Sequence, residues 1–213
     1  MATILILGAS RGIGLEFVRQ HRQAGDRVIA TARSNDGLQA LEALGAQTLM
    51  LDVAQPASIS RLAWSLDAEK IDVAVYVAGV YSTAGATEPP TQHDFDRVMH
   101  TNVLGAMQAI PQVGPLVEAA GGKFVFITSG MGHIAGTASS FGWLYKASKA
   151  ALNMVVKAAA SDYPGATFLA MSPGWVKTDM GGPGAPLTVE DSVSSMRQSG
   201  DFLDHDGTPF KGW

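Results

Sequence analysis

The sequence contains no cysteine among its 213 residues, which excludes disulfide bonds and thiolate metal ligands. This absence agrees with a reducing compartment, and a cytoplasmic location is expected. The five histidines show no ligand-like grouping, so no metal site is expected either. Apolar runs are too short to span a membrane, and the opening MATILILGAS lacks the basic start and cleavage site of a signal peptide. No membrane partner is therefore expected.

Charge of either sign is also scarce. Charged residues make up 16% of the chain, the formal net charge is -4, and no basic stripe is present, so nucleic acid is not an expected partner. Glycine, in contrast, is abundant: the 24 glycines exceed the usual share of about 7%. They gather in short motifs such as GASRGIG and GGPGAP. This clustering indicates specific backbone placement rather than disorder.

Short β-branched apolar runs alternate with longer amphipathic segments along the chain. Strands are expected at 3–8, 27–32, 47–51, 71–77, 122–128 and 165–171, and helices at 12–24, 37–45, 56–67, 91–119 and 143–161. Uninterrupted alternation of this kind predicts a parallel sheet covered on both faces. We therefore expect a single domain over residues 1–213, with a doubly wound, Rossmann-like α/β sheet of about seven strands and helices on both faces.

Residues 173–199 differ from the rest of the chain. They are rich in glycine and proline and then turn helical. A segment of this composition near the last strand is expected to form a mobile flap over a site at the carboxyl end of the sheet.

Three glycines separate the first expected strand from the first helix in LILGASRGIGLEF. Gly8, Gly12 and Gly14 follow the spacing GxxxGxG rather than the commoner GxGxxG. Glycine in such a turn lets the backbone approach a pyrophosphate, whose charge the helix N-terminus stabilises. Taken alone, a glycine-rich turn could be structural. Its position between strand and helix favours a dinucleotide site.

The end of the second strand bears on the choice of cofactor. An NAD site would need an Asp or Glu there to bind the ribose 2′-hydroxyl, but this chain has Arg33 in TARSN and Arg11 inside the glycine turn. Two guanidinium groups can bind a 2′-phosphate, so NADP(H) is favoured over NAD(H). Each arginine could instead be a solvated surface residue. Asp52, after the third strand, could accept from the adenine amino group or cap a turn.

The stretch LYKASKAALN places Tyr145 four residues before Lys149 in a run that reads as helix. Residues four apart share one helix face, so the phenol and the ammonium can meet. A nearby ammonium favours phenolate and would lower the phenol pKa from its usual value of about 10. The pair is then a tuned proton donor and acceptor. As an isolated motif, the spacing would also suit an ordinary helix-surface pair.

Five motifs occur in order along the chain: GASRGIG, HTNVLG, VFITSGMG, YKASK and SPGWVKTDM. With these motifs the sequence resembles the short-chain dehydrogenase/reductase family along nearly its whole length. The endings GGPGAPLTVEDSVSSMRQ and GDFLDHDGTPFKGW look like the branch of C-factor and sniffer-type carbonyl reductases. The resemblance implies an NADP(H)-dependent carbonyl reductase that acts on a small to medium ketone or aldehyde, or on the corresponding alcohol.

The resemblance also implies roles for individual residues. Tyr145 would be the general acid or base, Lys149 would lower its pKa and hold the nicotinamide ribose, and Ser129 would bind the substrate oxygen. Asn102 would complete a tetrad by holding a water in a proton relay to Lys149. The expected cofactor contacts are Gly8, Ser10, Arg11, Gly12, Ile13, Gly14, Arg33, Asp52, Val53, Ala78, Gly79, Tyr145, Lys149, Pro173, Gly174, Val176 and Thr178.

Two departures from the family pattern qualify this assignment. The usual NNAG after the fourth strand is replaced by Tyr76-Val77-Ala78-Gly79, which puts a supporting hydrogen bond of the central strand in doubt. The spacing from Ser129 to Tyr145 is longer than usual, so Ser139 or Ser140 is an alternative to Ser129 as the catalytic serine.

The sequence constrains the substrate only weakly. His133, Phe141, Trp143, Trp175 and Met180 are expected to border an apolar pocket, although each could equally serve packing. A homodimer or homotetramer is expected from the family's use of the two long helices at 91–119 and 143–161. The alternative function is a cofactor-binding regulatory or signalling protein of the same fold without relevant turnover.

Overall fold

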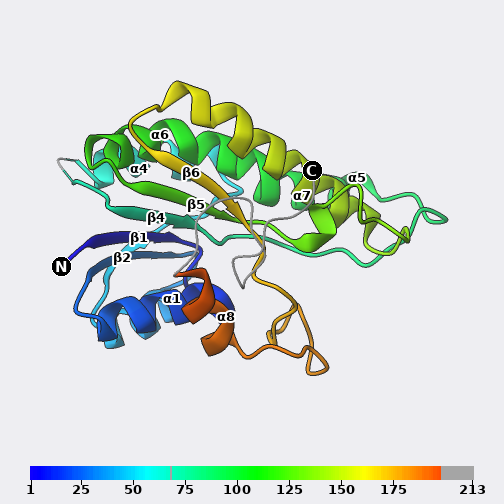
Figure 1. Ribbon diagram of the computed structural model, residues 1–213, viewed down its shortest axis with the longest axis horizontal. Coiled ribbons are helices and arrows are strands. Elements are labelled where there is room, and N and C mark those ends of the chain that lie inside the picture. The colour runs from blue at the N-terminus through cyan, green and yellow to red at the C-terminus, as the bar shows by residue number, and fades with distance from the viewer. Residues whose placement is uncertain (68, 198–213) are drawn as a thin grey trace.

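Six parallel strands form the central sheet of the computed structural model, which describes residues 1–67 and 69–197 (Figure 1). They are β1 (Thr3–Leu7), β2 (Arg27–Ala32), β3 (Gln47–Met50), β4 (Val73–Tyr76), β5 (Lys123–Ile127) and β6 (Thr167–Met171). The strand order is β3-β2-β1-β4-β5-β6, and every neighbouring pair is parallel. The winding therefore reverses between β1 and β4. The doubly wound, Rossmann-like fold is confirmed, with six strands in the described residues against about seven expected.

Helices cover both faces of the sheet, as the alternation of the sequence predicts (Figure 1). Along β1, Ile4 and Ile6 join one apolar core while Leu5 and Leu7 join the other, because successive strand residues point to opposite faces. The first core includes residues of α1 (Gly12–Gln23), α2 (Asn35–Ala43) and α8 (Val189–Met196). The second includes residues of α3 (Pro56–Ile59), α4 (Leu62–Ser65), α6 (Gly105–Ala119) and α7 (Trp143–Ala159).

Two of the expected helices differ in detail. The segment expected at 56–67 is split into α3 and α4, and between them the Ser60 hydroxyl donates to the carbonyl of Ala57, a bond that competes with helix continuation. The helix expected at 91–119 comprises α5 (Gln92–Met99), a π-helical segment η1 (His100–Leu104) and α6. Such π segments often occur at functional sites. Here the segment carries Asn102.

The expected flap consists of a folded loop followed by α8. Val176 bridges to Leu187 in parallel, and the Lys177 amide donates to the Leu187 carbonyl at 2.9 Å. Thr188 then caps α8 by accepting from the Asp191 amide at 3.0 Å. The end of the expected flap, at 198–199, and the motif GDFLDHDGTPFKGW lie outside the described residues. Across the described ranges, no helix combines the length and the apolar character that crossing a membrane requires.

Candidate active site

A cleft of about 440 Å³ opens at the carboxyl ends of the strands, where the winding reverses. The glycine turn, the end of β2 and residues 51–53 line one part of it, and residues 77–80, α7 and the flap line the rest. In a doubly wound sheet this is the position at which ligands bind. Segments far apart in the sequence therefore converge on one site.

The glycine turn fits tightly between β1 and the loop after β4. Gly8 has φ +93°, and a Cβ there would lie 2.7 Å from the Ala78 backbone nitrogen. A Cβ on Gly14 would lie 2.2 Å from the Gly8 carbonyl oxygen, so α1 approaches β1 closely only with glycine at this position. The turn therefore presents the N-terminus of a 12-residue helix to the cleft. Both features suit a pyrophosphate group.

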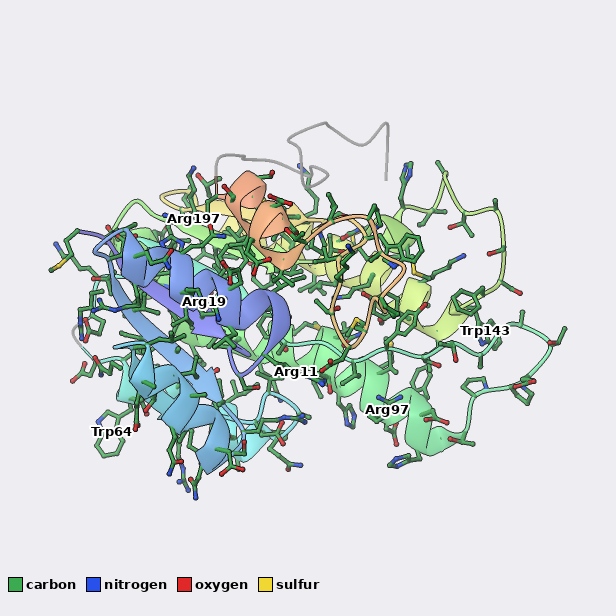
Figure 2. All side chains as sticks on the ribbon, turned by 90° about the horizontal axis from the view of Figure 1, so that it is seen from below. Arg11, Arg19, Trp64, Arg97, Trp143 and Arg197 are labelled. Carbon is green, nitrogen blue, oxygen red and sulfur yellow. The ribbon has the colours of Figure 1, made fainter. Side chains whose placement is uncertain are left out.

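The two arginines expected at the cofactor both line the cleft, but they are placed differently. Arg33 is exposed and forms no ion pair with any residue of the described ranges. Arg11 pairs with Asp179 of the flap at 2.8 Å, a contact that joins the glycine turn to the loop before α8. Figure 2 shows Arg11 between α1 and the helix α5, which carries Arg97. Arg11, expected together with Arg33 at the 2′-phosphate, is thus paired with a carboxylate in this structure.

Asp52 lies at the cleft and also stabilises a turn. One carboxylate oxygen accepts from the Ala54 amide at 3.0 Å, while the Asp52 amide donates to the Ser58 hydroxyl. Asp52 therefore caps a turn, which was one of the two roles expected for it. Its second carboxylate oxygen is left for other contacts.

Tyr145 and Lys149 lie one helical turn apart on α7, and both line the cleft. The Lys149 ammonium is 5.6 Å from the centroid of the Tyr145 ring and donates to the Ile127 carbonyl at 2.8 Å. The Ser129 hydroxyl, just after β5, forms a hydrogen bond with the Tyr145 side chain and accepts from the Met131 amide at 3.1 Å. These three groups could together bind an oxygen atom and exchange a proton with it.

Burial is the largest cause of the pKa shifts of Tyr145 and Lys149. It raises the pKa of Tyr145 to about 12, although the hydrogen bond from Ser129 works in the opposite direction. It also lowers the pKa of Lys149 to about 8. The pKa of Tyr145 therefore lies above its usual value, because removing the phenol from water is the largest contribution.

Asn102 is fully buried, and protein groups use both ends of its amide. The side-chain oxygen accepts from the Val80 amide at 2.8 Å, and the nitrogen donates to the Val80 carbonyl at 3.0 Å and to Ser148 Oγ at 2.9 Å. Ser148 in turn donates to the Tyr145 carbonyl at 2.7 Å. Asn102 thus ties the loop after β4 to the helix of the tyrosine.

Tyr76, which stands where the family has an asparagine, is buried and hydrogen-bonded. The buried Tyr76 hydroxyl donates to the Thr101 carbonyl at 2.8 Å and so joins β4 to the π-helical segment. A Cβ on Gly105 would lie 2.5 Å from this hydroxyl, which accounts for the glycine of HTNVLG. Tyr76 therefore supplies a supporting contact for the central strand.

Of the three candidate serines, the structure brings Ser129 to Tyr145. Ser139 instead accepts from Lys146 through its backbone carbonyl, and Ser140 lies against Gly85. Both are exposed.

Most of the residues expected to contact a cofactor line the cleft. Those that do not are Gly14, Gly174 and Val176, of which Gly174 has a positive φ and Val176 is buried. Of the expected pocket-border residues, Met180 lines the cleft, whereas His133, Phe141, Trp143 and Trp175 do not. Lining residues that the sequence reading missed are Ala32, Leu51, Val77, Val80, Thr101, Ile127, Thr128, Lys177 and Asp179. Several directly follow strands, and that position was the signal available for finding them.

The sequence profile of the short chain dehydrogenases matches residues 2–185. Among curated proteins, the C-signal of Myxococcus xanthus is 35% identical over 150 residues, which cover 65% of this chain and 90% of that protein.

Among solved structures, the carbonyl reductase Sniffer of D. melanogaster superposes with a TM-score of 0.91 at 27% identity, covering 100% of both chains. A carbonyl reductase from Pseudomonas aeruginosa PAO1 in complex with NADP superposes with a TM-score of 0.87 at 30% identity, again over 100% of both chains.

Proposed function

The chain belongs to the short-chain dehydrogenase family, and from that premise we propose that it is an NADP(H)-dependent oxidoreductase. Its reaction would be the reduction of a small to medium ketone or aldehyde to an alcohol, or the reverse. One observation carries the proposal: Tyr145 and Lys149 line the same cleft as the glycine turn that suits a pyrophosphate. Solved relatives are described as carbonyl reductases, one of them in complex with NADP.

The proposed roles follow from the contacts. When bound, the nicotinamide supplies or accepts the hydride. Tyr145 donates its proton to the carbonyl oxygen during reduction, and Ser129, whose oxygen already accepts from Met131, donates a hydrogen bond to the same substrate oxygen. Lys149 places a positive charge beside the phenol and so stabilises the phenolate that remains.

The cofactor would lie along the cleft from the end of β2 to the flap. The glycine turn would hold the pyrophosphate, Arg33 the 2′-phosphate, and Pro173 and Thr178 the nicotinamide end. Asn102 would act indirectly, by fixing the loop after β4 and the backbone of Tyr145 through Ser148.

Turnover is the decisive test of this function. The purified protein is mixed with NADPH and a panel of aliphatic and aromatic ketones and aldehydes, and the absorbance of the reduced nicotinamide is followed. Loss of absorbance that depends on substrate supports the oxidoreductase. NADPH binding without turnover of any carbonyl would favour the alternative, a regulatory or signalling protein.

Arg33→Ala is expected to weaken NADPH binding about tenfold and to leave NADH binding unchanged, because a charge-assisted bond to the 2′-phosphate is lost. Dissociation constants for both nucleotides, from quenching of protein fluorescence, measure the effect. Arg61→Ala removes another exposed arginine, at the start of α4, and serves as the matched control. Equal binding of NADH and NADPH by the parent would contradict the assigned preference.

Asp179→Asn is expected to tighten NADPH binding about two- to fivefold at low salt, because breaking the exposed ion pair releases Arg11 for the phosphate. The gain should shrink as the ionic strength rises. Titrations at two salt concentrations measure it, and an affinity that falls in this variant would show that the ion pair supports the site.

A further inference from the structure

Tyr81, in the loop after β4, lies with its ring against that of Tyr145. The two ring centroids are 4.7 Å apart and the planes are inclined by 82°, an edge-to-face arrangement. Lys149 approaches the Tyr145 ring from the same helix. The ring that carries the candidate proton donor therefore has one contact from its own helix and one from a loop 64 residues earlier in the sequence.

The main chain around Tyr81 is held from two helical segments. Asn102 binds both the amide and the carbonyl of the preceding residue, Val80, at 2.8 and 3.0 Å. Arg97 of α5 donates to the Tyr81 carbonyl at 3.2 Å, and the Tyr81 hydroxyl lies 4.0 Å from the sulfur of Met131. The main chain at Tyr81 is thus held by hydrogen bonds, and the tip of the ring touches Met131.

The same loop packs against the start of α7. The Gly142 amide donates to the Thr83 carbonyl at 3.3 Å, and a Cβ on Gly142 would lie 3.2 Å from the Ser82 carbonyl oxygen and 3.7 Å from the Tyr81 hydroxyl. Gly142 has φ +66°, which favours glycine. In Figure 2 the loop runs alongside Trp143, the first residue of α7. Residues 81–83 therefore contact the start of α7 directly.

Resting on the proposed function, we propose that Tyr81 is a positioning residue whose ring holds the Tyr145 ring so that its hydroxyl stays at Ser129. Proton transfer depends on alignment of donor and acceptor, and misplacement of the donor lowers the rate. The backbone of Tyr145 is fixed separately, through Ser148 and Asn102. Tyr81 adds the constraint on the ring itself.

The contributions of the Tyr81 ring and of its hydroxyl can be tested with different variants. Tyr81→Leu and Tyr81→Met remove the ring and are expected to lower kcat about five- to tenfold, with NADPH affinity within about twofold of the parent. Tyr81→Phe keeps the ring and should retain kcat. Phe95→Leu, which removes a partly exposed ring from α5, is the control for loss of an aromatic residue. Two ring-less variants are measured so that the result does not depend on the folding of one.

The pH dependence of alcohol oxidation provides a readout that a purely structural role would not move. Burial raises the pKa of Tyr145 most, and Tyr81 raises it further through charge repulsion. Ionisable groups that the described residues place near this ring pair include Lys149 on α7 and, beside the Tyr81 carbonyl, Arg97 and Asp94 on α5. In oxidation the rate rises with pH as Tyr145 loses its proton, so Tyr81→Phe should shift this rise to lower pH without reducing the plateau.

Failure of the positioning role and failure of the proposed function would give different results. Parental kcat in both Tyr81→Leu and Tyr81→Met, with Tyr145→Phe inactive, would overturn the positioning role and leave the oxidoreductase intact. An active Tyr145→Phe variant would instead refute the proposed function itself.

Discussion

Tyr145→Phe is expected to reduce kcat about 10²- to 10⁴-fold, because it removes the only part of the side chain that can donate a proton to the substrate oxygen. NADPH affinity should stay within about twofold of the parent, since the ring and its packing against Tyr81 remain. Steady-state assays with an active carbonyl substrate and separate NADPH titrations measure the two effects. The change therefore separates catalysis from binding.

The matched control for this variant is Tyr163→Phe. Tyr163 follows α7 and stacks on Phe168, with ring centroids 5.3 Å apart, away from the cleft. Its hydroxyl has no part in the proposed reaction, so the control should keep parental kcat. A Tyr145→Phe enzyme that retained more than about a tenth of the parental rate would refute the role of Tyr145 as proton donor.

Lys149→Met is expected to lower kcat at least about 100-fold, because the charge that stabilises the Tyr145 phenolate is lost. The same variant should be more stable than the parent at neutral pH. Burial lowers the pKa of Lys149 from 10.5 to about 8, so the folded state carries this cation at a cost of about 3 kcal/mol. Loss of the hydrogen bond to Ile127 offsets about 1–2 kcal/mol of that gain.

The direction of the pH dependence follows from the same shift. Between about pH 8 and pH 10.5 the unfolded chain holds the Lys149 proton and the folded chain does not, so this group makes stability rise with pH across that window. Below that window the cost of burying the cation is present in full. The stability advantage of Lys149→Met should therefore be largest below pH 8 and shrink toward pH 10.5.

Urea unfolding of parent and variant at several pH values measures this difference. Lys157→Met, in the exposed last turn of the same helix, is the control and should change neither kcat nor the pH dependence. A Lys149→Met protein that is less stable than the parent throughout this range would show that the ammonium stabilises the fold.

Local patterns in the sequence were sufficient to predict the strands, the glycine turn and the helix that carries the tyrosine–lysine pair. Strand positions follow from apolar runs, and the turn at Gly8 and Gly14 follows from the need for a backbone without Cβ. The pairing of Tyr145 with Lys149 follows from residues four apart sharing a helix face. Each of these depends on a few neighbouring residues.

Contacts between distant segments could not be predicted in this way. Arg11 was expected to contribute to a phosphate site, and the sequence did not indicate its ion pair with Asp179, which is 168 residues away. The side chain of Asn102 joins Val80 to Ser148 across the fold, a contact that the motif HTNVLG does not indicate. No local motif indicates which polar group will meet which, since that depends on how helices and loops pack.

The sequence by itself determined the doubly wound sheet, the dinucleotide-type turn and the spacing of the tyrosine–lysine pair, because short-range geometry controls all three. Only the tertiary structure decided how deeply that pair is buried, which loop supports it, and hence that the pKa of Tyr145 rises to about 12. The physical reason is that solvation and long-range contacts arise from the packed fold, whereas backbone periodicity is present in the chain before it folds.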